Sequence, residues 1–257
     1  MKSRTEAVII TCEHGGNRIP PRYRMLFDRG HAALNSHRGW DPGALQLARQ
    51  LAAAFDAPLH FSTVSRLLVD LNRSERHPRV FSRYTRALPE LERERVLKEH
   101  YRPYREAVLQ RIEGPVSGKN RVVHISVHSF TPVLKGVRRT ADIGLLYDPR
   151  RPSERALAAA WQHAIRSVQP GLKVRLNYPY LGTSDGHTTS LRGRFQADLY
   201  VGIEVEVNQS LVRAGGDRWA AVRRVLVQSL AVALGAEGAA GRGGRAVGPD
   251  RKRSLRP

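Results

Sequence analysis

Short apolar segments alternate with longer amphipathic segments along most of this chain, and this alternation constrains the fold more than any other feature. Apolar residues fill or alternate through the short segments 7–11, 122–128 and 143–147, whereas 152–168 and 217–234 space them as helices do. Strands that alternate with helices build a central sheet covered by helices. The sequence therefore predicts a single α/β domain with a mostly parallel or mixed central sheet and helices on both faces.

Length and composition are those of a globular protein. The chain has 257 residues, of which 41% are hydrophobic and 26% charged, so it can bury a sizeable core. Cys12 is the single cysteine, which excludes an intrachain disulfide and a cysteine-rich zinc site. No apolar run approaches the ~18 residues of a membrane-spanning helix, and the run 7–10 is too short for the core of a signal peptide. We therefore expect no membrane partner and a cytoplasmic location.

The net charge is unusual. There are 43 Lys and Arg residues against 23 Asp and Glu residues, which gives +20. Such a surface can attract nucleic acid by neutralising phosphates, and it can draw small anionic substrates to a site. It can equally reflect an arginine-rich composition without any partner. A nucleic-acid-associated protein is therefore kept as an alternative, and the charge does not predict an oligomeric state.

The last twenty residues differ from the rest of the chain. Segment 238–257 is rich in Gly and Ala and has six basic residues against one acidic residue. It offers no apolar face that could pack against a core. We expect a folded domain over residues 1–237 and a basic, disordered tail over 238–257.

Polar residues gather where the predicted strands end. His14 follows the strand 7–11 and precedes a glycine pair, which allows the backbone to turn sharply. In the alternating strand 123–128, His124, Ser126 and His128 share one face. Ligands of open α/β sheets bind at the carboxyl ends of the strands, so we expect a functional site there.

A second alternating strand, 201–208, places Glu204, Glu206 and Asn208 on one face. Two carboxylates on a buried face are costly unless they are paired or bind a cation. We expect Glu204 to pair with an arginine.

Three further elements are expected. Segment 67–69 is predicted to be a strand, and 89–112 a helix that Pro103 breaks or kinks. Asp41 and Pro42 are typical of an N-cap followed by a first-turn proline, which opens a helix with apolar residues from Leu45 to Phe55.

Four segments together resemble the N-formylglutamate amidohydrolase family. They are 11–20, 65–73, 127–129 and 206–209. Asp41 and the Tyr101-x-Pro103-Tyr104 element also fit, so the resemblance covers about residues 7–210. The family resembles a branch of the zinc-dependent carboxypeptidase and aspartoacylase fold, and this implies a zinc-exopeptidase-like architecture.

The resemblance implies one zinc ion per chain, held by His14 and His128. Enzymes of that fold take His-x-x-Glu as their first two ligands, but here the fourth position is Asn17. Asp41 and Glu13 are the candidates for the third ligand. Asp41 opens the helix where the missing Glu would lie, although an N-cap role would satisfy it equally. Neighbours on a strand point oppositely, so Glu13 and His14 are awkward joint ligands.

The resemblance also implies roles around the metal. Glu206 corresponds to the catalytic glutamate, and Arg66 could stabilise the oxyanion. Asn72 and Arg73 would grip the substrate carboxylate. In the glycine-rich loop 182–193, Arg192 is a candidate for a second carboxylate, and His187 is either a proton shuttle or a polar loop residue.

The sequence thus predicts a zinc-dependent amidohydrolase that acts on small anionic N-acyl amino acids, N-formyl ones in particular. A peptidase or an esterase of the same fold is a further alternative.

Overall fold

The computed structural model describes residues 6–243. In this range the strands are β1 (Glu6–Cys12), β2 (Leu59–Phe61), β3 (Arg121–Phe130), β4 (Val133–Leu134), β5 (Val137–Arg138), β6 (Ile143–Leu146), β7 (Val174–Leu176) and β8 (Tyr200–Asn208). The helices are η1 (Pro21–Phe27), α1 (His31–Leu34), α2 (Ala44–Ala54), α3 (Glu90–Val96), η2 (Leu97–Tyr101), α4 (Arg102–Ser117), α5 (Pro152–Val168), α6 (His187–Arg192), α7 (Gln209–Ala214) and α8 (Gly216–Gly243).

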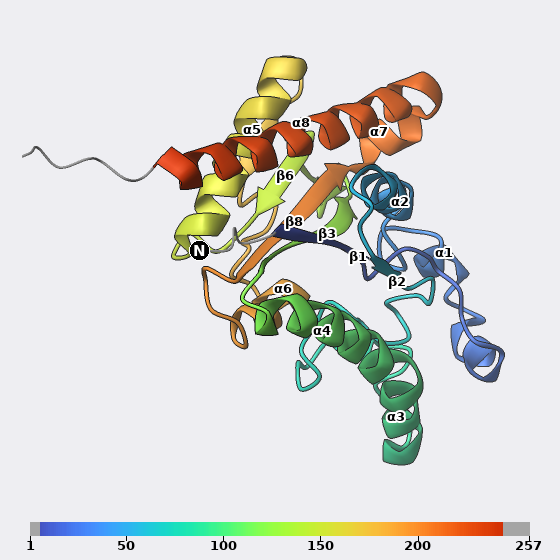
Figure 1. Ribbon diagram of the computed structural model, residues 1–257. Helices are drawn as coiled ribbons and strands as arrows, with labels where there is room; N and C mark the ends of the chain where they lie inside the picture. Colours follow the sequence, from blue (N-terminus) through green and yellow to red (C-terminus); the bar gives the residue numbers. More distant parts are fainter. Residues whose placement is uncertain (1–5, 244–257) are drawn as a thin grey trace, which may run out of the picture.

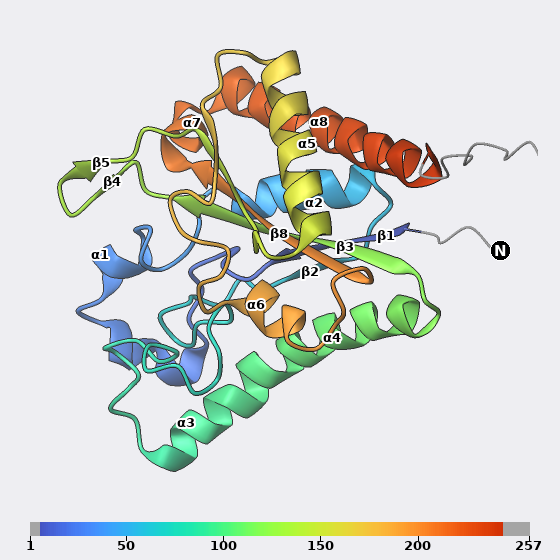
Figure 2. The ribbon, with the colours of Figure 1, turned by 90° about the vertical axis from the view of Figure 1, so that its left-hand side faces the viewer.

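A six-stranded mixed sheet with the order β2-β1-β3-β8-β6-β7 forms the centre of the described chain. β2, β1, β3 and β8 run parallel, β6 is antiparallel to β8, and β7 is parallel to β6. Figures 1 and 2 show α2, α5, α7 and α8 on one side of this sheet and α3, α4 and α6 on the other. The structure confirms the predicted α/β fold with a mixed sheet and helices on both faces.

The two faces of the sheet differ in chemistry, as the alternation predicts. Val123, Ile125 and Val127 of β3 belong to the main apolar core under α2, α5 and α8. The alternate residues of β3 are His124 and His128 with Ser126 between them, and they are buried on the other face. The strands therefore present buried polar groups toward α4 and α6, and the site is built from these groups.

Segment 67–69 is not a strand, contrary to the prediction. It lies in turns, and its apolar side chains pack in a second core cluster with Tyr23, Phe27 and Tyr101. A short apolar run has the same pattern whether it pairs in a sheet or packs in a buried loop. The strand that lies beside β1 is β2, which is only three residues long.

The helical region near 89–112 continues across Pro103 without a break. A π-helical turn, Leu97–Tyr101, joins α3 to α4, and Pro103 lies in the first turn of α4. The π-helical turn directly before Pro103 interrupts the regular hydrogen-bond pattern of the α-helix, and this lets the helix accommodate a residue without an N–H.

The expected boundary at 237/238 falls inside α8, which extends to Gly243. The remainder of the predicted tail, 244–257, lies outside the described residues. Over the part of the chain that the structure describes, no helix combines the length and apolar character needed to cross a membrane.

Candidate active site

His14 lies directly after β1, where the backbone runs against segment 62–63. A Cβ atom at Gly15 would lie 2.9 Å from the carbonyl oxygen of Ser62, and one at Gly16 would lie 2.7 Å from that of Thr63. No side chain fits at either position. The glycine pair therefore permits this close approach, which holds His14 at the sheet edge with an exposed fraction of only 1%.

Two histidines converge on one carboxylate. The Nδ1 of His128, near the end of β3, lies 3.0 Å from Oδ2 of Asp41, and the Nδ1 of His14 lies 3.4 Å from the same oxygen. The three residues are buried, and each offers a ligand atom within 4.8 Å of the other two. Two imidazole nitrogens and one carboxylate oxygen with room for a further ligand are a donor set of catalytic zinc sites.

Asp41 is not the N-cap of the helix that follows it. α2 begins at Ala44, and its N-cap is Gly43 with a φ of 81°, a left-handed conformation that favours glycine. The Asp41 carboxylate instead accepts a hydrogen bond from the backbone N–H of Ser129 (3.4 Å) and faces the two histidines. The charge of His14 and the hydrogen bond with His128 outweigh burial and hold the pKa of Asp41 well below its usual range.

The outer nitrogen of each histidine has a partner of its own. The Nε2 of His14 lies 2.7 Å from Oδ1 of Asp70. The Nε2 of His128 lies 3.0 Å from the Ser126 hydroxyl and 3.4 Å from Oε2 of Glu13. Histidines that bind metals commonly have a carboxylate or hydroxyl at the second nitrogen, which fixes the ring and its tautomer. Both rings are therefore oriented with Nδ1 toward Asp41.

This arrangement separates the two candidates for the third ligand. Asp41 lies with the histidines, whereas Glu13 lies behind His128 and is fully buried. The Glu13 carboxylate accepts hydrogen bonds from the hydroxyls of Ser126 (2.8 Å) and Tyr104 (3.1 Å). Burial would raise the pKa of Glu13, but the hydrogen bond with His187 (3.1 Å) and the nearby histidine charges hold it well below its usual range.

His187 is buried rather than an exposed loop residue. It is the first residue of α6, a short helix inside the glycine-rich segment 182–193. Its side chain is 1% exposed, and burial together with the charge of Arg105 lowers its pKa to about 4. A neutral His187 therefore bonds to Oε1 of Glu13, whereas His128 lies near Oε2.

Glu206 is a buried carboxylate at the carboxyl end of β8. Burial raises its pKa to about 8, and its Oε2 has no hydrogen-bond partner among the described residues. Glu204 does not pair with an arginine as expected. It accepts a hydrogen bond from the Thr188 hydroxyl (2.5 Å), and no arginine lies within ion-pair distance of it in the described range. Of the two, Glu206 is therefore the residue with a fully buried carboxylate oxygen that has no hydrogen-bond partner in the described range.

A cavity of about 650 Å³ opens onto these groups. It is lined by His14, Asp41, His128 and Glu206, and also by the predicted residues Arg66, Asn72 and Arg73.

The predicted binding residues are held by their neighbours. Arg66 donates to Asp70 (2.8 Å), and despite burial the charges of Asp70 and Asp41 raise its pKa. The Nδ2 of Asn72 lies 3.3 Å from Nε2 of His128. Arg73 donates to the backbone oxygen of Asp185 (2.7 Å).

Arg192 does not reach this cavity, contrary to the prediction. Its guanidinium donates to Glu154 (2.9 Å) and to the backbone oxygen of Gly202 (2.9 Å), with 5% of the side chain exposed. Glu154 is itself fully buried in α5. The pair joins α6 to α5 and β8, so the role of Arg192 is structural.

Some residues around the site were not singled out from the sequence. Asp70 is one, although it stands in the same motif as Asn72 and Arg73. Lys135, in the turn between β4 and β5, and Tyr180 also line the cavity. No local signal marks these two, because their place depends on how distant loops fold over the sheet.

A sheet whose parallel strands carry buried polar residues at their carboxyl ends is the arrangement of an α/β enzyme. Two solved structures share the fold. A gene product of Agrobacterium tumefaciens has a TM-score of 0.78 and 30% identity, with 91% of this chain and 92% of that chain covered. The N-formylglutamate amidohydrolase of Ralstonia eutropha JMP134 has a TM-score of 0.66 and 19% identity, with 91% and 95% covered.

The family model for N-formylglutamate amidohydrolase matches residues 6–213. The chain therefore belongs to the N-formylglutamate amidohydrolase family, as the sequence motifs indicated. No curated protein matched the chain.

Proposed function

We propose that this protein is a zinc-dependent hydrolase that cleaves the amide bond of small N-acyl amino acids with a free carboxylate. N-formylglutamate, the substrate in the family's name, is the first candidate. One observation carries the proposal: two histidines turn Nδ1 toward Asp41 in the same cavity that holds Glu206 without a partner for its Oε2. The donor set and the unpaired carboxylate together suit metal-assisted hydrolysis.

His14, Asp41 and His128 would hold one zinc ion per chain. When bound there, zinc would polarise the acyl carbonyl and lower the pKa of the attacking water. Asp70 and Glu13 would keep the two imidazole rings in place through their outer nitrogens.

Glu206 would serve as the proton-transfer group. It would accept the proton of the attacking water and deliver it to the nitrogen of the leaving amine. Its pKa of about 8 lies near neutrality, where a group can both take up and release a proton.

The arginines of the cavity suit a substrate that carries negative charge. Arg66 would donate to the oxyanion that develops on the oxygen of the acyl carbonyl. Arg73 and Asn72 would bind the free carboxylate, for which the planar guanidinium is well shaped. The negative charge of such a substrate would thus be complemented by the arginine side chains of the cavity.

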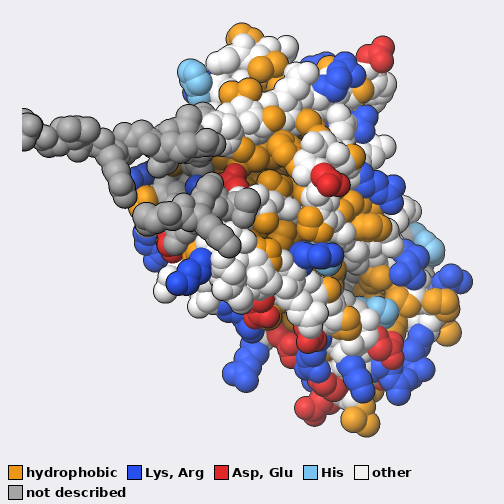
Figure 3. Space-filling view, in the orientation of Figure 1, with side chains coloured by type: hydrophobic (Ala, Val, Ile, Leu, Met, Phe, Trp, Pro, Cys, Tyr) orange, Lys and Arg blue, Asp and Glu red, His pale blue; other side chains and the backbone are white. Residues whose placement is uncertain are grey.

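Among the described residues, the face of the molecule in Figure 3 shows no single basic patch that would favour nucleic-acid binding. On the face in Figure 3, Lys and Arg side chains are scattered and are interspersed with Asp and Glu side chains, rather than gathered in one patch.

The cytoplasmic location remains a prediction from the sequence, as does a folded unit that ends near residue 237.

The direct test is hydrolysis of N-formyl-L-glutamate by the purified protein, followed as formate release. The comparison substrates are N-acetyl-L-glutamate, followed as acetate release, and a formylated amine without a carboxylate, followed as formate release. We expect release from the first to exceed that from the formylated amine by at least a hundredfold. A chelator should abolish it and added zinc restore it. Activity that survives complete metal removal would contradict the proposal.

A further inference from the structure

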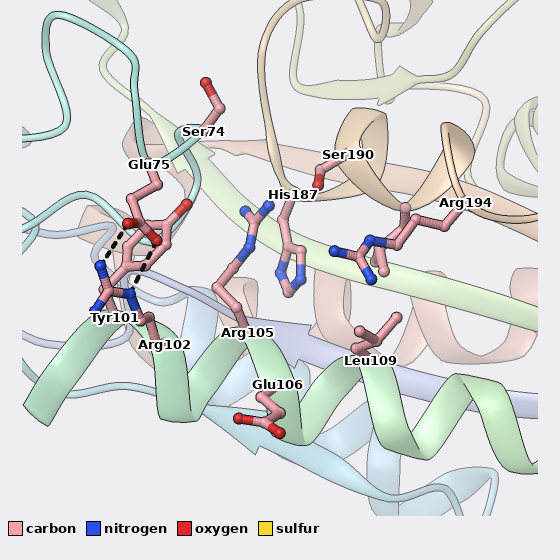
Figure 4. A pocket seen from close by; sticks show the side chains of 11 residues that line it. Ser74, Glu75, Tyr101, Arg102, Arg105, Glu106, Leu109, His187, Ser190 and Arg194 are labelled. Carbon is pink, nitrogen blue, oxygen red and sulfur yellow. Dashed lines mark hydrogen bonds and ion pairs between the residues drawn. The ribbon is translucent and has the colours of Figure 1, made fainter. Parts of the chain in front are cut away.

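A second cavity, of about 460 Å³, lies between α4 and α6 (Figure 4). Its volume is within the range of small-molecule sites. Of the residues that line it, none has a role in the reaction proposed above. They come from three places: the loop residues Ser74 and Glu75, the continuous helix formed by η2 and α4, and α6 with Arg194 just after it.

The cavity contains two arginines whose charge is not neutralised by a carboxylate. Arg102 is paired with Glu75 and Glu94. Arg105 and Arg194 have no ion pair among the described residues. Glu106 accepts a hydrogen bond from Gln110, and Figure 4 shows its carboxylate turned away from His187. The cavity therefore has an excess of positive charge.

Arg105 is held in place, although it lacks an acidic partner. Its Nη1 donates to the backbone oxygen of Leu71 (3.1 Å), and its guanidinium carbon lies 5.6 Å from the centre of the Tyr101 ring. These contacts fix the group but leave other N–H donors. In the view of Figure 4, His187 lies between the guanidinium groups of Arg105 and Arg194. The imidazole of His187 lines this cavity, although only 1% of the side chain is exposed, and it contributes a polar group to the cavity wall.

We propose that this second cavity binds a small anion with a carboxylate or phosphate group, held by Arg105 and Arg194. Guanidinium groups bind both kinds of anion through paired N–H donors. The Ser74 and Ser190 hydroxyls at the same cavity are further donors. This site is separate from the catalytic one and does not depend on the proposed reaction.

The two cavities share a wall and are separate sites. The wall consists of segments 72–74 and 185–187. The backbone N–H of His187 donates to Oδ1 of Asn72 (2.6 Å), and the N–H of Ser74 donates to the carboxylate of Asp185 (3.1 Å). Asn72 and Arg73 line the catalytic cavity, whereas Ser74 and His187 line the second one.

Calorimetric titration of the full-length, metal-loaded protein tests the site. Inorganic phosphate and glutarate are titrated separately at fixed ionic strength. We expect saturable binding of at least one probe, weakened tenfold or more by Arg105→Gln and by Arg194→Gln. Arg155→Gln, which removes an exposed arginine on α5, should leave it within twofold. Arg194 is exposed, so its substitution is compatible with folding, which circular dichroism checks.

Other outcomes overturn the proposal. The proposal is wrong if neither probe binds saturably. It is also wrong if the wild type and both variants bind the probe with equal affinity. A probe lost only with Arg73→Gln would belong to the catalytic cavity. Formate release is measured on the same samples, so absence of activity with intact anion binding would refute the proposed function and leave this site standing.

Discussion

His128 on β3 and Glu206 on β8 are register partners on adjacent parallel strands, so their side chains leave the sheet on the same face at its carboxyl edge. The same strand pairing places Ser126 opposite Glu204. Sheet register, rather than loop conformation, therefore sets the candidate proton acceptor beside a candidate metal ligand. Groups held on strands are positioned more firmly than groups on loops.

Glu206→Gln is expected to keep bound metal and substrate affinity while kcat falls by roughly 10² to 10⁴, the usual contribution of a general base. The amide has nearly the same shape but cannot accept the proton. Steady-state kinetics with a parallel metal analysis measures both quantities. Glu204→Gln is the matched control, since its partner is the Thr188 hydroxyl, and a loss below tenfold is expected there. Equal losses of kcat in the two variants would show that Glu206 is not the proton-transfer group.

Arg73→Ala is expected to raise KM by roughly tenfold to a hundredfold, because a hydrogen bond to a charged group contributes about 1.5–3 kcal/mol. Arg73→Lys should not restore it, since an ammonium group lacks the bidentate geometry. Wild type should discriminate against a substrate whose carboxylate is replaced by an amide, and the Arg73→Ala enzyme should scarcely do so. If both enzymes discriminate equally, another cation binds the carboxylate.

Arg192→Met is expected to destabilise the fold by about 1–3 kcal/mol, because the buried Glu154 carboxylate loses its nearest guanidinium group and the backbone oxygen of Gly202 loses its donor. Arg151, at 3.4 Å, is the ion-pair partner of Glu154 that remains in the described range. The double variant with Glu154→Gln should recover part of this loss. Urea unfolding monitored by circular dichroism gives the free energies. If the Arg192→Met protein is stable and no longer distinguishes acid from amide substrates, Arg192 binds the substrate and its structural role is wrong.

His124 should make stability depend on pH. It is buried between the Thr11 hydroxyl and the Tyr200 hydroxyl, each at 2.8 Å, and burial with the charge of His187 lowers its pKa to about 3. In the unfolded chain His124 takes up a proton as the pH falls through about 6.5, whereas in the folded chain it does so only near pH 3. The stabilisation is therefore complete above pH 6.5 and is lost as pH falls toward 3.

His124→Gln removes that titration. Its free energy of unfolding should fall less steeply between pH 6.5 and pH 4.5 than that of wild type, by up to about 1.4 kcal/mol per pH unit. Urea unfolding at three pH values in this range measures the two slopes. Identical slopes would show that His124 does not titrate as described.

The strands of the site could be predicted from the sequence because one face of each strand packs in the apolar core and the other carries buried polar side chains. In β3 and β8 the period of two residues separates apolar from polar side chains, and the polar ones mark the site face. The apolar run at 67–69 carries no such period, and its place in a loop depends on Tyr23, Phe27 and Tyr101, far away in the sequence.

The partners of charged residues were not predictable in this way. Asp41 precedes a proline and a helix, so its local sequence satisfies an N-cap role, while its contact with His128 spans 87 residues. Arg192 lies in a glycine-rich segment, a pattern that favours a ligand-binding loop, but its partner Glu154 comes from α5. Such pairings depend on tertiary packing, which single-sequence patterns do not encode.

Metal analysis of the purified protein tests the central claim most directly. Inductively coupled plasma mass spectrometry on the wild type and on His14→Ala, Asp41→Asn and His128→Ala variants, each shown to be folded by circular dichroism, gives the zinc content per chain. We predict one zinc per wild-type chain and less than a tenth of that in the His128→Ala protein, with clear losses in the other two. Stoichiometric zinc in a folded His128→Ala protein would contradict the account.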